Sequence, residues 1–252
     1  MAEIVLTIDN LGEATELERG TWDGSAPLGR HPSVTVALPR LLAELEHHRL
    51  RATFCVEAIN CRLYPVAVRA IATAGHELAV HGYRHETWAS LPPDRERELL
   101  ARARLAYTAL GLAPQGFRPP GGGLTAATPG LLREHGFAWA SPERDAVPAA
   151  TDAAGPAWVP FDWADVDALY LLSAFDQLRL EHGLPSALVP PGDAFRALAD
   201  ALERPQRRTL VLHPFLMLDP AWWEEVRVLL AEIADRVAAG TVRCLTAGEA
   251  AG

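Results

Sequence analysis

Short strand-like segments alternate with helix-like segments along almost the whole chain, and this order constrains the fold more than any other feature of the sequence. Because a helix separates consecutive strands, the strands are expected to run parallel and to be joined by right-handed crossovers. A closed barrel and an open doubly wound sheet both satisfy this order. The expected strands cover residues 3–8, 51–57, 77–81, 115–118, 137–140, 158–161, 209–213 and 242–245.

Three segments between these strands are expected to be irregular, and the first is too long to be a plain connection. Residues 10–33 are polar and are expected to form a functional loop, and residues 141–156 form a loop rich in Pro, Ala and Gly. Residues 166–191 are apolar but interrupted by Gly and Pro, which indicates a short helix followed by an irregular, lid-like segment. Helical spacing is found in residues 34–48 (with a start near Pro39), 63–74, 92–110, 126–135, 193–203 and 220–239.

The composition is that of an ordinary globular protein, with 49% hydrophobic and 22% charged residues among 252. We expect a single domain spanning residues 1–252, because α/β barrels of about this length are often single domains. The net charge of −9, without a basic cluster, argues against nucleic acid or an anionic membrane as a partner. Three cysteines without metal-binding spacing and the lack of a leader-like start favour a cytoplasmic protein. The oligomeric state is left open.

Ionisable side chains follow five of the expected strands at the point where each strand ends. In a parallel α/β fold the carboxyl ends of the strands share one face, where active sites are built. Each residue alone is a weak signal, and their convergence carries the argument. These residues are Asp9 with Asn10, His81 with His85 beyond it, Arg118, Asp162 and His213.

The pair His81 and His85 is half of a candidate metal site. Imidazoles four residues apart can hold one Zn²⁺, and a catalytic zinc needs a third protein ligand and an open position. The alternative is a buried histidine at a strand end followed by an exposed one. The third ligand is expected from Asp9 or Asn10.

The other residues at the strand ends suggest the remaining parts of a hydrolytic site. Asp9 is a candidate general base. Arg118 precedes a rigid Pro- and Gly-rich loop and can hold a carboxylate or a substrate, or merely order the loop. His213 is a candidate proton donor or a core histidine, and Asp162 or Asp167 could orient it or Arg118. We expect Trp163, Pro119, Gly121 and Leu212 to line the substrate pocket.

Other histidines and tryptophans receive structural interpretations. A tandem tryptophan pair, Trp222-Trp223, is expected to make core and capping contacts at a helix start. Six histidines have no partner pattern and are treated as structural: His31, His47, His48, His76, His135 and His182.

Five segments, in order, resemble the motifs of the polysaccharide deacetylases (carbohydrate esterase family 4), nearest the intracellular subgroup that includes peptidoglycan-deacetylase-like proteins and allantoinases. The segments are Thr7-Ile-Asp9-Asn10, His81-Gly-Tyr-Arg-His85, Arg118-Pro-Pro-Gly121, Asp162-Trp163 and Leu210-Val-Leu-His213-Pro. The resemblance implies a distorted (β/α)7 barrel with the active site at the carboxyl ends of the strands. It also implies a divalent metal, usually zinc, and hydrolysis of an N-acetyl or related amide.

Carried over by position, the resemblance gives each residue a role. Asp9 falls on the base, Asn10 on the metal-binding carboxylate, and His81 and His85 on the metal-binding imidazoles. Arg118 falls on the residue that braces the base, Asp162 on the residue that tunes the acid, and His213 on the acid.

One departure from the family pattern concerns the metal site. The family usually has two aspartates in the first motif, whereas this chain has Asp9-Asn10. An amide oxygen is a neutral and weaker ligand than a carboxylate. Either Asn10 ligates poorly, or Asp9 moves to the metal and leaves the base role to water or to Glu13, or the site has lost hydrolysis.

The function expected from these residues is hydrolysis of a C–N bond in a small soluble amide or a saccharide-like amide. The metal is expected to activate water, Asp9 to take its proton, and His213 to protonate the leaving nitrogen. Two alternatives stay open. One is a non-hydrolytic or metal-free homologue, such as a cyclase, a lyase or a binding module, which Asn10 favours. The other is a ring-opening amidase of the allantoinase type.

Overall fold

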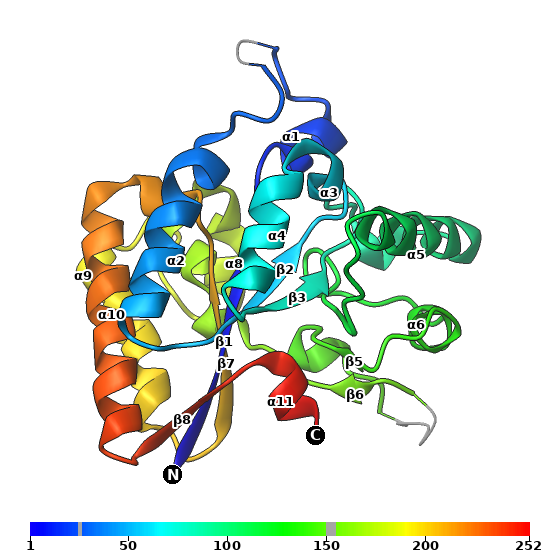
Figure 1. Cartoon of the computed structure of the whole chain (residues 1–252). Coiled ribbons are helices and arrows are strands. Elements are labelled where there is room, and N and C mark those ends of the chain that lie inside the picture. Colours follow the sequence, from blue (N-terminus) through cyan, green and yellow to red (C-terminus); the bar gives the residue numbers. More distant parts are fainter. Residues whose placement is uncertain (25–26, 150–154) are drawn as a thin grey trace.

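The strands form one curved, parallel sheet in the computed structural model, which describes residues 1–24, 27–149 and 155–252 (Figure 1). The strand order is β6-β5-β4-β3-β2-β1-β7, with β8 also paired to β1, and all of these pairings are parallel. The prediction of parallel strands is therefore confirmed. The strands are β1 (Ala2–Asp9), β2 (Thr53–Val56), β3 (Glu77–Val80), β4 (Gly116–Phe117), β5 (Trp139–Ala140), β6 (Ala157–Trp158), β7 (Arg207–Leu212) and β8 (Val242–Leu245).

The sheet curls toward a barrel, and this excludes the open doubly wound alternative. Strands β6 and β7 end the pairing order, yet the segments around them meet. The Thr209 hydroxyl donates a hydrogen bond to the Pro160 carbonyl at 2.8 Å, and Val166 forms a parallel bridge with Val211. The result is a curled half-barrel, consistent with the distorted (β/α)7 barrel expected from the sequence.

The helices cover the outer surface of the curled sheet (Figure 1). Helix α10, the longest of those described, packs on α9 and on β8. The α-helices are α1 (Ala14–Arg19), α2 (Leu38–His47), α3 (Asn60–Leu63), α4 (Pro65–Thr73), α5 (Pro93–Thr108), α6 (Thr128–Glu134), α7 (Asp167–Leu171), α8 (Asp176–Glu181), α9 (Pro191–Ala199), α10 (Pro220–Ala238) and α11 (Ala247–Ala251).

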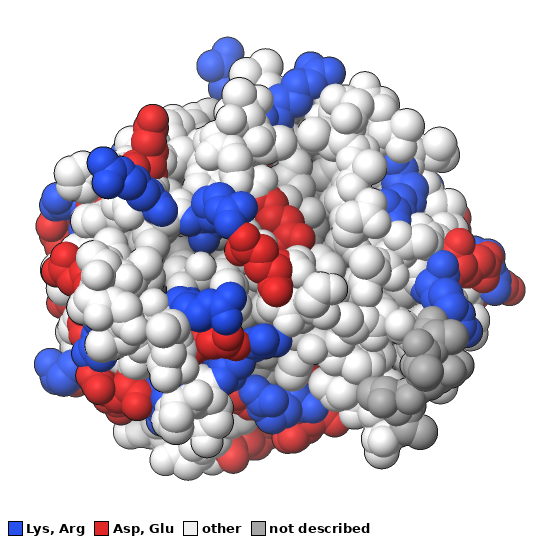
Figure 2. All heavy atoms as spheres, turned by 60° about the horizontal axis from the view of Figure 1, so that its bottom comes forward, with Lys and Arg blue, Asp and Glu red and all other residues white. Residues whose placement is uncertain are grey.

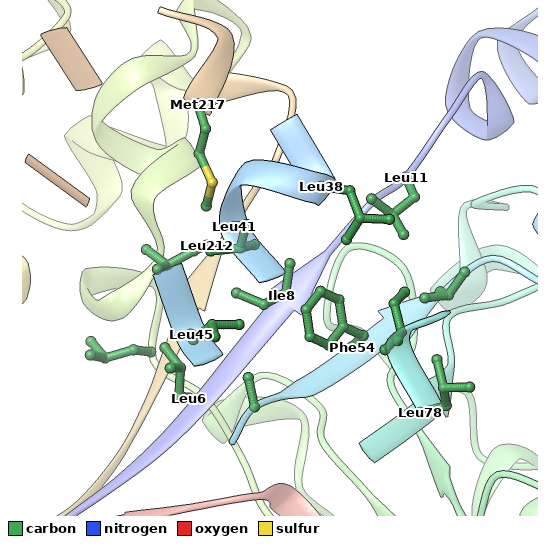
Figure 3. Close-up of a cluster of buried hydrophobic side chains, with 14 of the residues drawn as sticks. Leu6, Ile8, Leu11, Leu38, Leu41, Leu45, Phe54, Leu78, Leu212 and Met217 are labelled. Carbon is green, nitrogen blue, oxygen red and sulfur yellow. The ribbon is translucent and has the colours of Figure 1, made fainter. Parts of the chain in front are cut away.

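The two faces of the strands pack against different partners, because successive side chains of a strand point to opposite faces. On β1, Leu6 and Ile8 point outward into the main core under α2 (Figure 3). Val5 instead belongs to a smaller cluster inside the barrel, which α11 closes from the amino-terminal end of the strands. The same alternation puts Thr7 and Asp9 on the inner face, at the opposite end from α11.

The face at the amino-terminal ends of the strands carries acidic and basic side chains side by side (Figure 2). Glu3 at the start of β1 accepts hydrogen bonds from Arg207 at 2.9 Å and from Arg243 at 2.8 Å. Charges paired in this way satisfy one another, and in barrels this end serves stability rather than chemistry. No described helix is long and apolar enough to cross a membrane.

Several boundaries differ from those predicted. Strand β2 ends at Val56, so Glu57 follows the strand, and the strand predicted at 158–161 is formed by Ala157–Trp158. The segment 166–191 contains α7 and α8. A π-helical turn at Ser33–Ala37 leads directly into α2, so the helical stretch begins before Pro39 and not near it as expected. The predicted loops 10–33 and 141–156 include residues 25–26 and 150–154, which lie outside the described residues.

Candidate active site

A buried ion pair occupies the inner face of β1. Arg118, which follows β4, donates hydrogen bonds to Asp9 at 2.8 Å, to the Thr7 hydroxyl at 2.7 Å and to the Ser141 hydroxyl at 2.8 Å. Burial by itself raises the pKa of Asp9, but the positive charge of Arg118, helped by His81 and His213, outweighs it and lowers the pKa below its ordinary value. Asp9 is therefore held ionised, as a general base has to be.

The two histidines of the central motif lie together beside Asp9. Their ring centroids are 5.0 Å apart, and Nε2 of His81 is 3.9 Å from Oδ2 of Asp9. Nδ1 of His81 donates a hydrogen bond to the Arg118 carbonyl at 2.9 Å, which leaves Nε2 with its lone pair. Burial lowers the pKa of His81 to about 4 and that of His85 to about 3, so both rings are neutral at pH 7, the form that binds metal.

The turn between the two histidines is held by its own residues. Gly82 has φ +69°, and a Cβ there would lie 2.6 Å from the Glu86 carboxylate. Glu86 is buried and accepts hydrogen bonds from the backbone N–H groups of Tyr83 and Arg84, both at 2.9 Å. His85 itself has φ +72°, a conformation that non-glycine residues rarely adopt, and such strain concentrates at functional sites.

Glu57 lies beside the two histidines and was not among the site residues predicted from the sequence. One ligand atom from each of Glu57, His81 and His85 lies within 4.8 Å of the others, a group that could hold a metal ion. Burial is the main cause that raises the pKa of Glu57, to about 8. The signal was present in the sequence, because Glu57 follows β2 directly, but the predicted strand 51–57 included this residue and so hid its position at a strand end.

Asn10 belongs to the same pocket lining as His81 and His85. Its backbone is left-handed, with φ +62°, a conformation that asparagine tolerates better than most residues. Its Oδ1 is buried and has no hydrogen-bond partner among the described residues. A buried oxygen without a partner is costly, which is the condition that a bound ligand would relieve.

His213 forms the other side of the site together with Asp167. Nδ1 of His213 donates to Oδ1 of Asp167 at 2.5 Å, and its backbone N–H donates to Oδ2 at 2.8 Å. Burial alone would lower the pKa of His213, but the Asp167 carboxylate, with a smaller contribution from Asp9, raises it above its ordinary value. The contact with Asp167 therefore stabilises the protonated form of His213.

Asp162 does not take the position that the resemblance gave it. Its carboxylate accepts two hydrogen bonds from Arg144, at 2.8 and 3.0 Å, and lies 3.6 Å from Arg208. The contact with His213 that was expected of Asp162 is made by Asp167, the second candidate in the sequence. The short 3₁₀ turn at Trp163–Asp165 separates the two aspartates and sends Asp162 toward the outer arginines.

Six of these residues line one pocket with a volume of about 430 Å³: Asp9, Asn10, His81, His85, Arg118 and His213. Of the residues expected to line it, Trp163, Pro119 and Gly121 do so. Leu212 does not, because it is fully buried in the core under α2 (Figure 3). On β7 the side chains alternate, so Val211 and His213 face the pocket while Leu212 faces the helices.

The first loop contributes to the pocket through α1. Arg19 and His31 belong to its lining, and Nδ1 of His31 lies 2.7 Å from the Ser33 hydroxyl within the same loop. Glu13 was considered as an alternative base, but it is buried and accepts hydrogen bonds from Gly29 N–H at 2.9 Å and from the Tyr64 hydroxyl at 2.6 Å. It therefore holds the loop in place. Trp222 and Trp223 are buried in the core, as expected.

Known proteins similar to this chain include polysaccharide and peptidoglycan deacetylases. Residues 21–140 match the sequence model of a family described as "Polysaccharide deacetylase". A peptidoglycan deacetylase of Helicobacter pylori is 31% identical over 103 residues, which are 40% of this chain and 35% of that protein. The crystal structure of a candidate polysaccharide deacetylase from Mycobacterium smegmatis superposes with a TM-score of 0.83 at 26% identity and covers 99% of this chain and 88% of the other. The part of the chain from residue 21 to residue 140 is thus similar to the polysaccharide deacetylases.

The matches cover only part of the curated relatives. The segments matched in the curated relatives span about a third of those proteins, 35% for the Helicobacter pylori enzyme and 31% for one of Bacillus cereus. The crystal structure of Puue allantoinase also superposes, with a TM-score of 0.77 over 99% of this chain and 89% of that one, but its identity of 18% shows the fold alone. The activity and the substrate therefore have to be argued from the site itself.

Proposed function

We propose that the protein is a metal-dependent hydrolase that removes an acyl group from the nitrogen of a small, soluble amide. The observation that carries the proposal is the convergence of three parts on one pocket. These are two neutral histidines beside unsatisfied oxygen donors, a carboxylate held ionised by Arg118, and a histidine whose proton affinity is raised by Asp167. Acyl transfer from nitrogen to water needs an electrophile activator, a base and an acid, and each part fits one of these roles.

The donor atoms fit a divalent metal. His81 offers Nε2, since its Nδ1–H is engaged by a backbone carbonyl, an arrangement common for metal-binding histidines. His85 offers the second imidazole, and the unsatisfied oxygens of Asn10 and Glu57 lie at the same strand ends. Nitrogen and oxygen donors of this kind suit Zn²⁺. When bound, such an ion supplies Lewis acidity to a substrate carbonyl and to water.

Asp9 is suited to the role of base. Arg118 binds its Oδ1, and its Oδ2 is directed toward His81, 3.9 Å from Nε2. The carboxylate is therefore ionised, fixed in orientation, and next to the histidines. From this position Asp9 takes a proton from the attacking water.

His213 is suited to the role of acid. Its Nδ1–H is held by Asp167, which fixes the ring and leaves Nε2 for the leaving nitrogen. Because Asp167 raises the pKa of His213, the imidazolium form persists to higher pH than for an ordinary histidine. A departing amine needs this proton, since an amide anion is too basic to leave.

The pocket walls support a small substrate with an apolar or ring-shaped part. Phe161, Trp163 and Phe175 form a chain of edge-to-face contacts, with centroids 5.4 and 5.5 Å apart, and all three line the pocket. Aromatic faces of this kind pack on sugar rings and on other apolar groups. Arg19 at the pocket lining offers a positive charge to the rest of the substrate. An N-acylated amino sugar or a comparable small amide matches this lining.

The proposal is tested by measuring amine release from a panel of N-acyl amino sugars, aryl amides and allantoin with the chelator-treated and the Zn²⁺-reconstituted protein. We expect amine release only from the reconstituted protein, and a loss of about 100-fold or more in turnover for Asp9→Asn or His213→Asn. Asp162→Asn is the matched control, because this carboxylate binds Arg144 and not His213, and it is expected to keep activity. The absence of turnover with Zn²⁺, Co²⁺, Ni²⁺ and Mn²⁺ across the panel would overturn the proposal.

A second candidate function, a binding protein without hydrolysis, is favoured by one observation: an asparagine stands at the position of the expected metal carboxylate. In that case the protein would bind panel compounds but release no amine. Titration calorimetry of the same compounds, run beside the activity assay, separates the two functions.

A further inference from the structure

The metal site of the proposed function lacks a charged oxygen ligand at the position where the family resemblance expects one. Asn10 stands there, and its amide oxygen is neutral. A divalent ion held by two imidazoles and an amide would keep its full charge in a buried site, which is unfavourable. A carboxylate from another position would remove this difficulty.

Glu57 provides such a carboxylate from the neighbouring strand. Strands β1 and β2 pair with Asp9 opposite Cys55, so Glu57 leaves β2 beside the point where Asn10 leaves β1. The side chain of Glu57 is fully buried. It faces the same end of the barrel as His81 and His85, with one oxygen in the three-residue group described above.

Only one of the two carboxylate oxygens of Glu57 has hydrogen-bond partners among the described residues. Oε2 accepts hydrogen bonds from Leu11 N–H and from the Asn60 amide, both at 3.2 Å. These donors are neutral and fix the orientation of the carboxylate. Oε1 is buried and has no hydrogen-bond partner among the described residues, as is true of Oδ1 of Asn10. Two unsatisfied oxygens therefore lie at adjacent strand ends, and a carboxylate oxygen of Glu57 lies within 4.8 Å of ring nitrogens of His81 and His85.

We propose that Glu57 is the carboxylate ligand of the metal in this protein, together with His81 and His85, and that Asn10 offers only a neutral oxygen. The inference rests on the proposed function, because it assigns a ligand within that metal site. It also removes the need for Asp9 to move to the metal. Asp9 is bound to Arg118 and is not a member of the group formed by Glu57 and the two histidines.

The test is a set of metal titrations on the full chain, stripped with a chelator, using Zn²⁺ and Co²⁺ and reading heat and the Co²⁺ visible spectrum. The variants are Glu57→Gln, Asn10→Asp and the double variant. Glu57→Gln keeps the size of the side chain and removes its charge, so we expect metal affinity to fall by about 100-fold or more, beyond what loss of an outer hydrogen bond causes. The double variant returns a carboxylate to the site from β1, and we expect its affinity to recover to within about 10-fold of wild type.

Glu77→Gln is the matched control. Glu77 is a carboxylate at the opposite end of the barrel, where it accepts hydrogen bonds from Thr53 and Trp139, and its replacement should leave metal affinity unchanged. Circular dichroism and thermal unfolding check that each variant folds. If Glu57→Gln fails to fold, Glu57→Asp serves instead, because it keeps the charge and shortens the reach, and we expect it to bind metal more weakly than wild type.

The outcomes separate this inference from the proposed function. If the wild-type protein binds metal and Glu57→Gln binds it equally well, or if Asn10→Asp does not rescue Glu57→Gln, the assignment of Glu57 is overturned while the metal-dependent hydrolase stands. If the wild-type protein binds neither Zn²⁺ nor Co²⁺, the metal-dependent function itself is overturned.

Discussion

The exchange Asp167→Asn changes the proton affinity of His213 without removing either side chain. In the structure the carboxylate of Asp167 accepts the Nδ1–H of His213 at 2.5 Å and the backbone N–H at 2.8 Å. Asparagine is nearly isosteric and can keep one of these contacts, but it carries no charge. The imidazolium form of His213 then loses the partner that stabilises it inside the protein.

The magnitude follows from the charged hydrogen bond. Such a bond contributes about 1.5–3 kcal/mol, which corresponds to a fall in the proton affinity of His213 of about 10- to 150-fold. Because Asp167 raises the pKa of His213, the stabilisation by this pair is fully present below the pKa of an unfolded histidine and is lost as pH rises through the folded pKa. In Asp167→Asn, we expect the loss to occur at lower pH, and the alkaline limb of the rate profile to move in the same direction.

The assay is an NMR titration of the His213 ring, combined with kcat as a function of pH on a substrate from the amide panel. Asp162→Asn is the control, since Asp162 contacts Arg144 instead of His213. An unchanged titration of His213 in Asp167→Asn, or an equal shift in Asp162→Asn, would refute the reasoning that assigns this role to Asp167.

Three further predictions concern the stability of the site. Arg118→Met leaves the carboxylate of Asp9 buried without its partner, and we expect a loss of about 3–5 kcal/mol in the free energy of urea unfolding, partly recovered by adding Asp9→Asn. In the metal-free protein, burial raises the pKa of Glu57 to about 8. The free energy of unfolding should therefore fall as pH rises from 4.5 toward 8, by an amount on the order of a few kcal/mol. Glu57→Gln should flatten this decline, and an unaltered pH profile in the variant would contradict the argument from burial. In Gly82→Ala, an alanine has to adopt the left-handed backbone of Gly82 and its Cβ meets the Glu86 carboxylate. We expect a loss of about 1–3 kcal/mol in the free energy of unfolding, seen as a lower melting temperature, together with weaker metal binding. A variant as stable as wild type would show that the turn tolerates the side chain.

The sequence sufficed to predict the parts of the site that depend on local pattern. Parallel strands place their carboxyl ends on one face, so residues directly after a short apolar run could be assigned to that face. Asp9, His81, Arg118 and His213 all follow this rule, and the structure brings them to one pocket. The rule needs only strand identity and direction, both of which the alternation of elements supplies.

The same rule failed where a boundary had to be known to one residue. Glu57 was counted inside its strand, since nothing in the run 51–57 marks Val56 as the last paired residue. Leu212 was expected in the pocket. A shift of one position along a strand moves a side chain to the other face of the sheet, and Leu212 lies on the face that packs into the main core. Register of this kind is set by pairing with β1, which lies far away in sequence.

Tertiary contacts decided the choice between Asp162 and Asp167. Both lie in the segment that follows β6, and the resemblance favoured Asp162. The outer arginines, which come from segments distant in sequence, compete for Asp162, while a 3₁₀ turn brings Asp167 back toward β7. Neither the arginine contacts nor the turn could be inferred from the local pattern.

The measurement that tests the metal site most directly is the anomalous scattering of a crystal soaked in Zn²⁺, recorded at the zinc absorption edge. We expect one peak at about 2.0–2.2 Å from Nε2 of His81, a ring nitrogen of His85 and an oxygen of Glu57, the distances typical of protein zinc sites. A peak bound to Asp9 in place of Glu57 would contradict the ligand assignment, and no peak between the two histidines would contradict the metal-dependent hydrolase itself.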